Sequence, residues 1–354
     1  MNPRLLAVVF TVIAVGALAP ALSAGQSAEP PTPLTPWGDP DLQGVWDFRT
    51  IIPLERPDDR AGQAFLTDEE AAQLEQEAID EDERLNEPSD VDRPVLPAGG
   101  NTGAYNNFWL DWGTNVLESR RTSLIVDPPD GRLPPVQPGV RTQQGMGPDG
   151  DDVLGPRPAR FRAGGIGTDG PEDRGLSERC LLGFNSGPPV MPSAYNNNIQ
   201  VFQTEDHVVI LVEMVHDARI IPLDGRPHLS PAIRQWFGDA RAHWDGDTLV
   251  VETTNFTDKT GSFDPLFSTS IGEGTYLTLT ERYRRLDADT LLLEYTVDDP
   301  TTFTRPFTVQ LPMRRSAEPI YEYACHEGNH AMPNMLGGAR AEERAARAAD
   351  PAAP

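Results

Sequence analysis

The chain has 354 residues and is strongly acidic, with 54 Asp and Glu against 29 Lys and Arg and a formal net charge of −25. This charge argues against nucleic-acid binding, which depends on clustered Lys and Arg, and against adsorption to an anionic membrane surface. Gly and Pro are abundant, at 31 and 35 residues, but they lack the three-residue period of collagen. The length fits one large domain or two modest ones.

The N-terminal segment, residues 1–24, has the pattern of a signal peptide. Arg4 supplies a positive start, Leu5 to Leu18 are apolar, and Ala21-Leu22-Ser23-Ala24 has the small residues of a cleavage site. The apolar stretch is shorter than the roughly 20 residues that a membrane-spanning helix needs. We therefore expect a periplasmic or extracellular protein without stable membrane insertion after cleavage, with an uncleaved anchor as the alternative. Residues 25–40 have the composition of a flexible lead-in.

The chain has two cysteines, Cys180 and Cys325. An even number of cysteines in an exported chain favours a disulfide, here one that closes a long loop. The alternative is a cysteine nucleophile, since His326 directly follows Cys325. The disulfide is the preferred interpretation.

One helix and one long irregular region are expected before the main run of strands. Thr67-Asp68-Glu69-Glu70 forms a capping box, which predicts a helix ending near Leu85. Residues 106–112 carry three aromatic side chains that we expect to be buried. Residues 127–192 are too rich in Gly and Pro for long regular elements. Because Cys180 is expected to bond to Cys325, we predict an ordered, wrapping loop region there.

After residue 198 the sequence changes to short strands separated by turn residues, which is typical of an antiparallel barrel or sandwich. Together with strands near 41–47 and 122–126, the expected strands are 199–204, 207–216, 218–223, 241–244, 248–255, 276–285, 290–298, 302–313 and 320–325. The prediction is a mainly β protein of about ten strands, in which an antiparallel meander closes into a barrel or sandwich, since closure removes exposed edges. Residues 41–338 form this single β domain, and residues 339–354 form a C-terminal tail.

Alternation along four of these strands places polar residues on faces that are otherwise apolar. The four residues are His216, Glu281, Tyr295 and Arg305. A buried charge needs a partner, so we expect Glu281 and Arg305 to pair inside the barrel, with His216 and Tyr295 near its open end. These four are the candidate ligand-binding residues. The alternative is that they form a structural network or reach solvent at strand ends.

One segment matches a zinc motif in sequence. His326-Glu327-Gly328-Asn329-His330 satisfies H-E-x-x-H, which binds zinc when it lies on a helix. Gly328, Asn329 and the nearby Pro333 disfavour a helix. We therefore predict a turn and no metal site, and no motif for another cofactor is present.

Two resemblances to known families follow from short segments. Gly44-Val45-Trp46 at the start of the first strand resembles the G-x-W of lipocalin-like (calycin) proteins, which implies an apolar ligand inside a barrel. Residues 38–46, 213–219 and 323–329 resemble segments of a family of exported bacterial proteins without an assigned activity. That second resemblance implies no catalytic residues.

These observations predict an exported binding protein for a small apolar or aromatic molecule held in a β-barrel pocket. The first alternative is an exported enzyme, a hydrolase, isomerase or lyase, that uses His216 with Asp217 or Glu281, because His titrates near neutral pH. The second alternative is a structural or interaction protein of the cell envelope.

Overall fold

The computed structural model describes residues 33–87, 107–144, 168–266 and 269–349. The expected signal peptide and the first half of the expected lead-in, residues 25–32, lie outside these residues. Within them, the protein is mainly β, with one ten-stranded and one three-stranded antiparallel sheet and two α-helices. Neither helix combines the length and the apolar character needed to cross a membrane.

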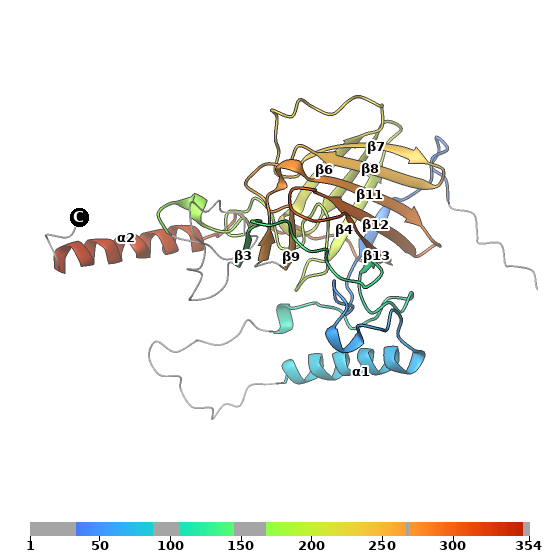
Figure 1. Ribbon diagram of the computed structural model, residues 1–354, viewed down its shortest axis with the longest axis horizontal. Helices are drawn as coiled ribbons and strands as arrows, with labels where there is room; N and C mark the ends of the chain where they lie inside the picture. Colours follow the sequence, from blue (N-terminus) through green and yellow to red (C-terminus); the bar gives the residue numbers. More distant parts are fainter. Residues whose placement is uncertain (1–32, 88–106, 145–167, 267–268, 350–354) are drawn as a thin grey trace, which may run out of the picture. The chain divides into compact units, whose positions relative to one another are not determined.

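The large sheet contains two meanders that are joined by the first strand. Its order is β6-β5-β4-β1-β13-β12-β11-β8-β7, and β2 pairs with β13 beside this path. Figure 1 shows β7, β8, β11 and β12 lying side by side. The strands are β1 (Gly44–Asp47), β2 (Ile125–Asp127), β4 (Asn198–Gln203), β5 (His207–Val212), β6 (Asp217–Pro222), β7 (Asp239–Asp245), β8 (Thr248–Thr254), β11 (Thr278–Arg285), β12 (Thr290–Asp298) and β13 (Phe307–Ser316). The small sheet pairs β10 (Thr269–Ile271) with β3 (Thr142–Gln144) and β9 (Phe263–Leu266).

The helix predicted from the capping box is confirmed as α1 (Asp68–Leu85). The Thr67 hydroxyl accepts a hydrogen bond from Glu70 N at 3.2 Å, and Glu70 Oε2 accepts one from Thr67 N at 2.8 Å.

The C-terminal helix α2 (Ala331–Ala349) begins eight residues before the expected tail at residue 339. The strand expected at 320–325 is wrong, because these residues form an irregular segment that ends in a turn.

The expected closure into a barrel does not occur. The edge strands β6 and β7 approach each other, but no strand pairing connects them, and we call this gap the seam. The concave side of the sheet is packed with apolar side chains, among them Leu293, Val297 and Val309, which are fully buried. The interior therefore resembles the core of a folded domain more than the ligand cavity of a lipocalin.

A buried ion pair joins the two sides of the open sheet. The Arg219 side chain from β6 donates to both carboxylate oxygens of Glu281 on β11, at 3.0 and 2.5 Å. Arg219 also donates to Thr253 on β8, and the Tyr283 hydroxyl donates to Glu281 at 2.9 Å. Burial by itself lowers the pKa of Arg219, but the attraction of Glu281 outweighs it and raises that pKa. The interior thus holds a buried ion pair.

The expected partner of Glu281 was wrong, although its burial and that of Tyr295 are confirmed. Arg305 is half-exposed and forms an ion pair with Asp127 at 2.8 Å. It lies in a bend before Pro306, outside β13, so strand alternation does not apply to it. Alternation along β6 points to Arg219 instead, because Arg219 and Ile221 face the interior while Ile220 faces outward.

We predict that Arg219→Met lowers the free energy of unfolding by about 3–5 kcal/mol, because it leaves the Glu281 carboxylate buried without its cation. Combining Arg219→Met with Glu281→Leu should restore much of this loss, since well-packed apolar residues often replace a buried ion pair without penalty. Urea-induced unfolding followed by circular dichroism measures both effects.

Arg305→Met is the matched control for this prediction. Its ion pair with Asp127 is exposed, and such pairs contribute about 0–1 kcal/mol. Equal destabilisation by Arg219→Met and Arg305→Met would contradict the assignment of the buried pair.

Candidate functional site

Four aromatic side chains converge on one cavity of about 520 Å³. We call it the aromatic cavity. It brings together residues from the end of β1, the 107–111 segment, the approach to β4, the start of the β5–β6 connection, and the segment after β13. Its lining consists of Arg49, Trp109, Asp111, Tyr195, Asn196, Asn198, Glu213, Ser316, Glu318, Pro319, Tyr321 and Tyr323.

The aromatic residues of the 107–112 segment are exposed, which corrects the expectation that they are buried. Trp109 keeps 61% of its surface exposed, and Phe108 and Trp112 are also exposed. Arg49 fixes this segment because it bonds to Asp47 at the end of β1 and to Asp111 at 2.5 Å. The hydrogen bond with Asp47 raises the pKa of Arg49, so its charge is permanent. This three-residue ion network forms one wall of the cavity.

Two buried asparagines hold the wall that carries Tyr195. Asn185 Nδ2 donates to the carbonyls of Tyr195 and Asn196 and to Asn197 Oδ1, at 3.0–3.1 Å. Asn197 Nδ2 in turn donates to the Asp111 and Ser193 carbonyls, at 3.0 and 2.8 Å. These bonds define the path of the 193–197 segment. They also connect it to the segment that carries Trp109.

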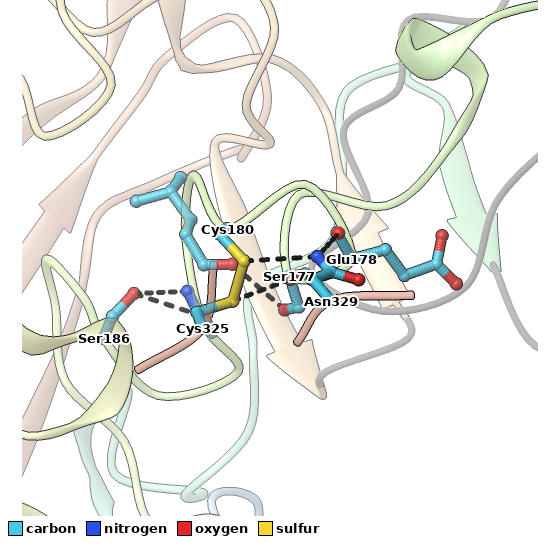
Figure 2. Close-up of a disulfide and its surroundings, with 8 residues drawn as sticks. Ser177, Glu178, Cys180, Ser186, Cys325 and Asn329 are labelled. Carbon is cyan, nitrogen blue, oxygen red and sulfur yellow. Dashed lines mark hydrogen bonds between the residues drawn. A yellow bond between two sulfur atoms is a disulfide. The ribbon is translucent and has the colours of Figure 1, made fainter. Parts of the chain in front are cut away.

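The predicted disulfide is confirmed, and it anchors the segment that carries Tyr321 and Tyr323. Cys180 and Cys325 are joined with a Cα–Cα distance of 5.7 Å (Figure 2). The Asn329 side-chain amide donates to the Glu178 carbonyl at 2.9 Å, beside the bridge. The Tyr323 and Tyr195 rings stack with centroids 6.5 Å apart. Tyr323 is thus held against the loop before β4.

Glu213 contributes a buried carboxylate to the cavity. Only 5% of its surface is exposed. Its oxygens accept hydrogen bonds from Asn198 Nδ2 at 2.8 Å and from Tyr321 N at 3.4 Å. Among the described residues, no Arg, Lys or His lies within ion-pair distance of this carboxylate. A buried carboxyl group bonded only to neutral donors offers a hydrogen-bond acceptor to a cationic or N–H group.

A strained turn between β5 and β6 carries Glu213. The strand expected to reach His216 ends at Val212, and a short 3₁₀ turn follows. Val215 and His216 have φ values of +66° and +58°, which are unfavourable for side chains with a Cβ. Gly183 packs directly on this turn, because a Cβ there would lie 2.0 Å from Met214 Cγ. Such strain often marks a functional position.

The predicted site residues do not form one site. His216 is half-buried beside Glu213, and its backbone N donates to the Glu213 carbonyl at 3.1 Å. Asp217 lies at the exposed start of β6. Glu281 and Tyr295 belong to the packed interior, and Arg305 lies outside it.

The histidines of the H-E-x-x-H motif, His326 and His330, lie in the connection between the disulfide and α2. No cluster of metal-ligating side chains occurs in the part of the chain that the structure describes. Asn329 of this motif instead bonds beside the disulfide.

Sequence reasoning missed Glu213 because alternation along 207–216 puts it on the solvent side of a strand. The 3₁₀ turn changes its direction and buries it. Two signals were present in the sequence: the run Asn196-Asn197-Asn198 and the three aromatics of 107–112. Neither signal identifies the residues that complete the aromatic cavity. Those residues come from segments about 85 to 215 residues away in sequence.

We predict that replacing both cysteines, with Cys180→Ala and Cys325→Ala, lowers the free energy of unfolding by about 2–5 kcal/mol, as expected for a bridge across a long loop. Amide exchange should accelerate most in residues 318–329, because the bridge anchors this segment. Hydrogen exchange followed by mass spectrometry measures it. The β12 amides report the loss of global stability, since core-strand amides exchange through global unfolding. Unchanged protection of 318–329 would contradict the anchoring role.

No protein-family model matches the chain, and no curated protein matches it. We therefore infer the chemistry of the aromatic cavity from the residues that line it. They are four aromatic rings, an Arg49 ion network, and a buried Glu213 carboxylate that is bonded only to neutral donors.

Proposed function

We propose that the protein binds a small aromatic molecule in the aromatic cavity. The single observation that carries this proposal is the convergence of Trp109, Tyr195, Tyr321 and Tyr323 on one concave site. Exposed aromatic surface of this kind is unfavourable in water and is typical of binding sites. The sequence predicted a ligand inside a barrel, whereas the aromatic cavity lies outside the sheet interior. That interior is filled by its own side chains.

The rings favour an aromatic ligand over a merely apolar one. An aromatic pair contributes about 0.5–1.5 kcal/mol beyond the burial of its surface. Trp109 and Tyr321 are largely exposed, at 61% and 63%, so a ligand that covers them removes a large apolar area from water. Tyr195 and Tyr323 already stack on each other and form a preorganised wall.

The polar side chains favour a ligand that carries a hydrogen-bond donor or a positive charge. Glu213 is a buried acceptor, and Glu318 is a further carboxylate of the lining. Arg49 is already engaged by Asp47 and Asp111, so it offers little to an anionic ligand. An aromatic amine matches both the rings and the carboxylate.

Export belongs to the same proposal. The disulfide supports it, because such bonds persist in oxidising compartments and are rare in the cytosol. The acidic composition is compatible with a protein that meets neither nucleic acid nor an anionic membrane surface.

We predict that tyramine, a phenol with an ammonium group, binds more tightly than cyclohexanol, which has no aromatic ring. Tyr321→Ala should weaken tyramine binding about tenfold, because it removes one stacking partner worth about 1.4 kcal/mol. Isothermal titration calorimetry measures both affinities.

Tyr276→Ala is the matched control, since Tyr276 is similarly exposed, at 61%, and does not line the cavity. Glu213→Gln should weaken tyramine binding by about tenfold or more and leave the binding of phenol nearly unchanged, because only tyramine carries a charge. Equal effects of Tyr321→Ala and Tyr276→Ala, or no binding of either aromatic probe, would overturn the proposal.

A further inference from the structure

A second cavity of about 520 Å³ lies at the seam and shares no lining residue with the aromatic cavity. We call it the seam pocket. It is formed by the start of β6, the 234–241 segment that leads into β7, and the loop at the disulfide. Its lining consists of Cys180, Leu181, Asp217, Ala218, Arg219, Ile220, Arg234, Gln235, Trp236, Phe237, Gly238, Asp239, Ala240 and Arg241.

Three arginines line this one pocket, in a chain whose acidic residues outnumber its basic ones almost two to one. Each arginine side chain forms hydrogen bonds with neighbouring protein groups. Arg219 is bonded to Glu281 and Thr253. Arg234 Nη1 donates to the carbonyls of Phe256 and Thr275, at 3.0 and 2.8 Å. Arg241 donates to Asp239 at 2.8 Å and to the Pro227 and Ala240 carbonyls. The guanidinium groups are therefore fixed before any ligand arrives.

These bonds leave donors unused. Within the described residues, Arg219 Nε is buried without a hydrogen-bond partner. In the part of the chain that the structure describes, the Nη2 groups of the exposed Arg234 and the half-buried Arg241 also have no protein acceptor, and they face solvent. Arg219 is more than nine-tenths buried, so an unpaired donor on it calls for a partner. A guanidinium has five N–H donors in a planar fork, which suits a carboxylate or phosphate.

The two carboxylates of the lining do not supply that partner. Asp239 already accepts hydrogen bonds from Arg241, His228 Nδ1 and Leu229 N, at 2.8–2.9 Å. Burial by itself raises the pKa of Asp239, but these bonds outweigh it and hold that pKa below its usual value. Asp217 lies at the exposed rim, where its carboxylate accepts from Ala218 N.

We propose that the seam pocket is an oxyanion site that binds the carboxylate or phosphate group of a small molecule. Arg234 and Arg241 supply the donors at its mouth, and Arg219, whose charge is already paired with Glu281, contributes only its unpaired Nε donor to the lining. Trp236 and Phe237, both half-buried in the lining, offer an apolar surface to the rest of the molecule. This site is independent of the aromatic cavity.

The test is calorimetric titration of the full chain with three probes: benzoate, acetate and inorganic phosphate. Binding of benzoate more tightly than acetate assigns a carboxylate next to an apolar group, and binding of phosphate assigns a general oxyanion site. Arg234→Gln should weaken any such binding at least tenfold. Arg241→Lys should weaken it to a smaller degree, because Lys keeps the charge and loses the fork.

Arg282→Gln is the matched control, since Arg282 is an exposed arginine of the same sheet that pairs with Asp245. It should leave the affinities unchanged, and circular dichroism confirms that each variant is folded. The proposal is overturned if none of the three probes binds below about 10 mM, or if Arg234→Gln and Arg282→Gln have equal effects. Tyr321→Ala distinguishes the two sites, because it should weaken tyramine and not benzoate.

Discussion

The ion pair between Arg219 and Glu281 joins the two sides of an open sheet. The large sheet ends in two edge strands that approach without pairing, so backbone hydrogen bonds do not hold them together there. The guanidinium of β6 and the carboxylate of β11 join the two sides through the interior. Two charges out of water are favourable only when both are paired and bonded. Thr253 adds a hydrogen bond to the guanidinium, and Tyr283 adds one to the carboxylate.

The packed interior leaves both concave sites at the periphery of the sheet. Because the concave side of the sheet is filled with apolar side chains around the buried charge, no room remains there for a ligand of the lipocalin type. Concave surface occurs instead where loops meet the ends and edges of the sheet. The β5–β6 connection links both places, since Glu213 lines the aromatic cavity and Asp217 and Arg219 line the seam pocket.

The loops that build the aromatic cavity are ordered by polar contacts more than by a core of their own. The disulfide holds the segment of Tyr321 and Tyr323, and the Asn185 and Asn197 amides fix the loop of Tyr195. The Arg49 network ties the segment of Trp109 to β1. Such contacts give precise positions to exposed rings, and preorganised rings bind a ligand with a smaller entropy loss.

The sequence by itself determined the features that depend on near neighbours. The capping box at Thr67, the strand hairpins after residue 198, and the burial of Glu281 and Tyr295 follow from local patterns with periods of 3.6 and 2 residues. The tertiary structure alone decided the partner of Glu281, the open seam and both cavities. These depend on contacts between distant segments, and local patterns do not encode them. Arg305 and Glu213 illustrate the reason, because a bend and a 3₁₀ turn each interrupt the alternation that would otherwise predict their direction.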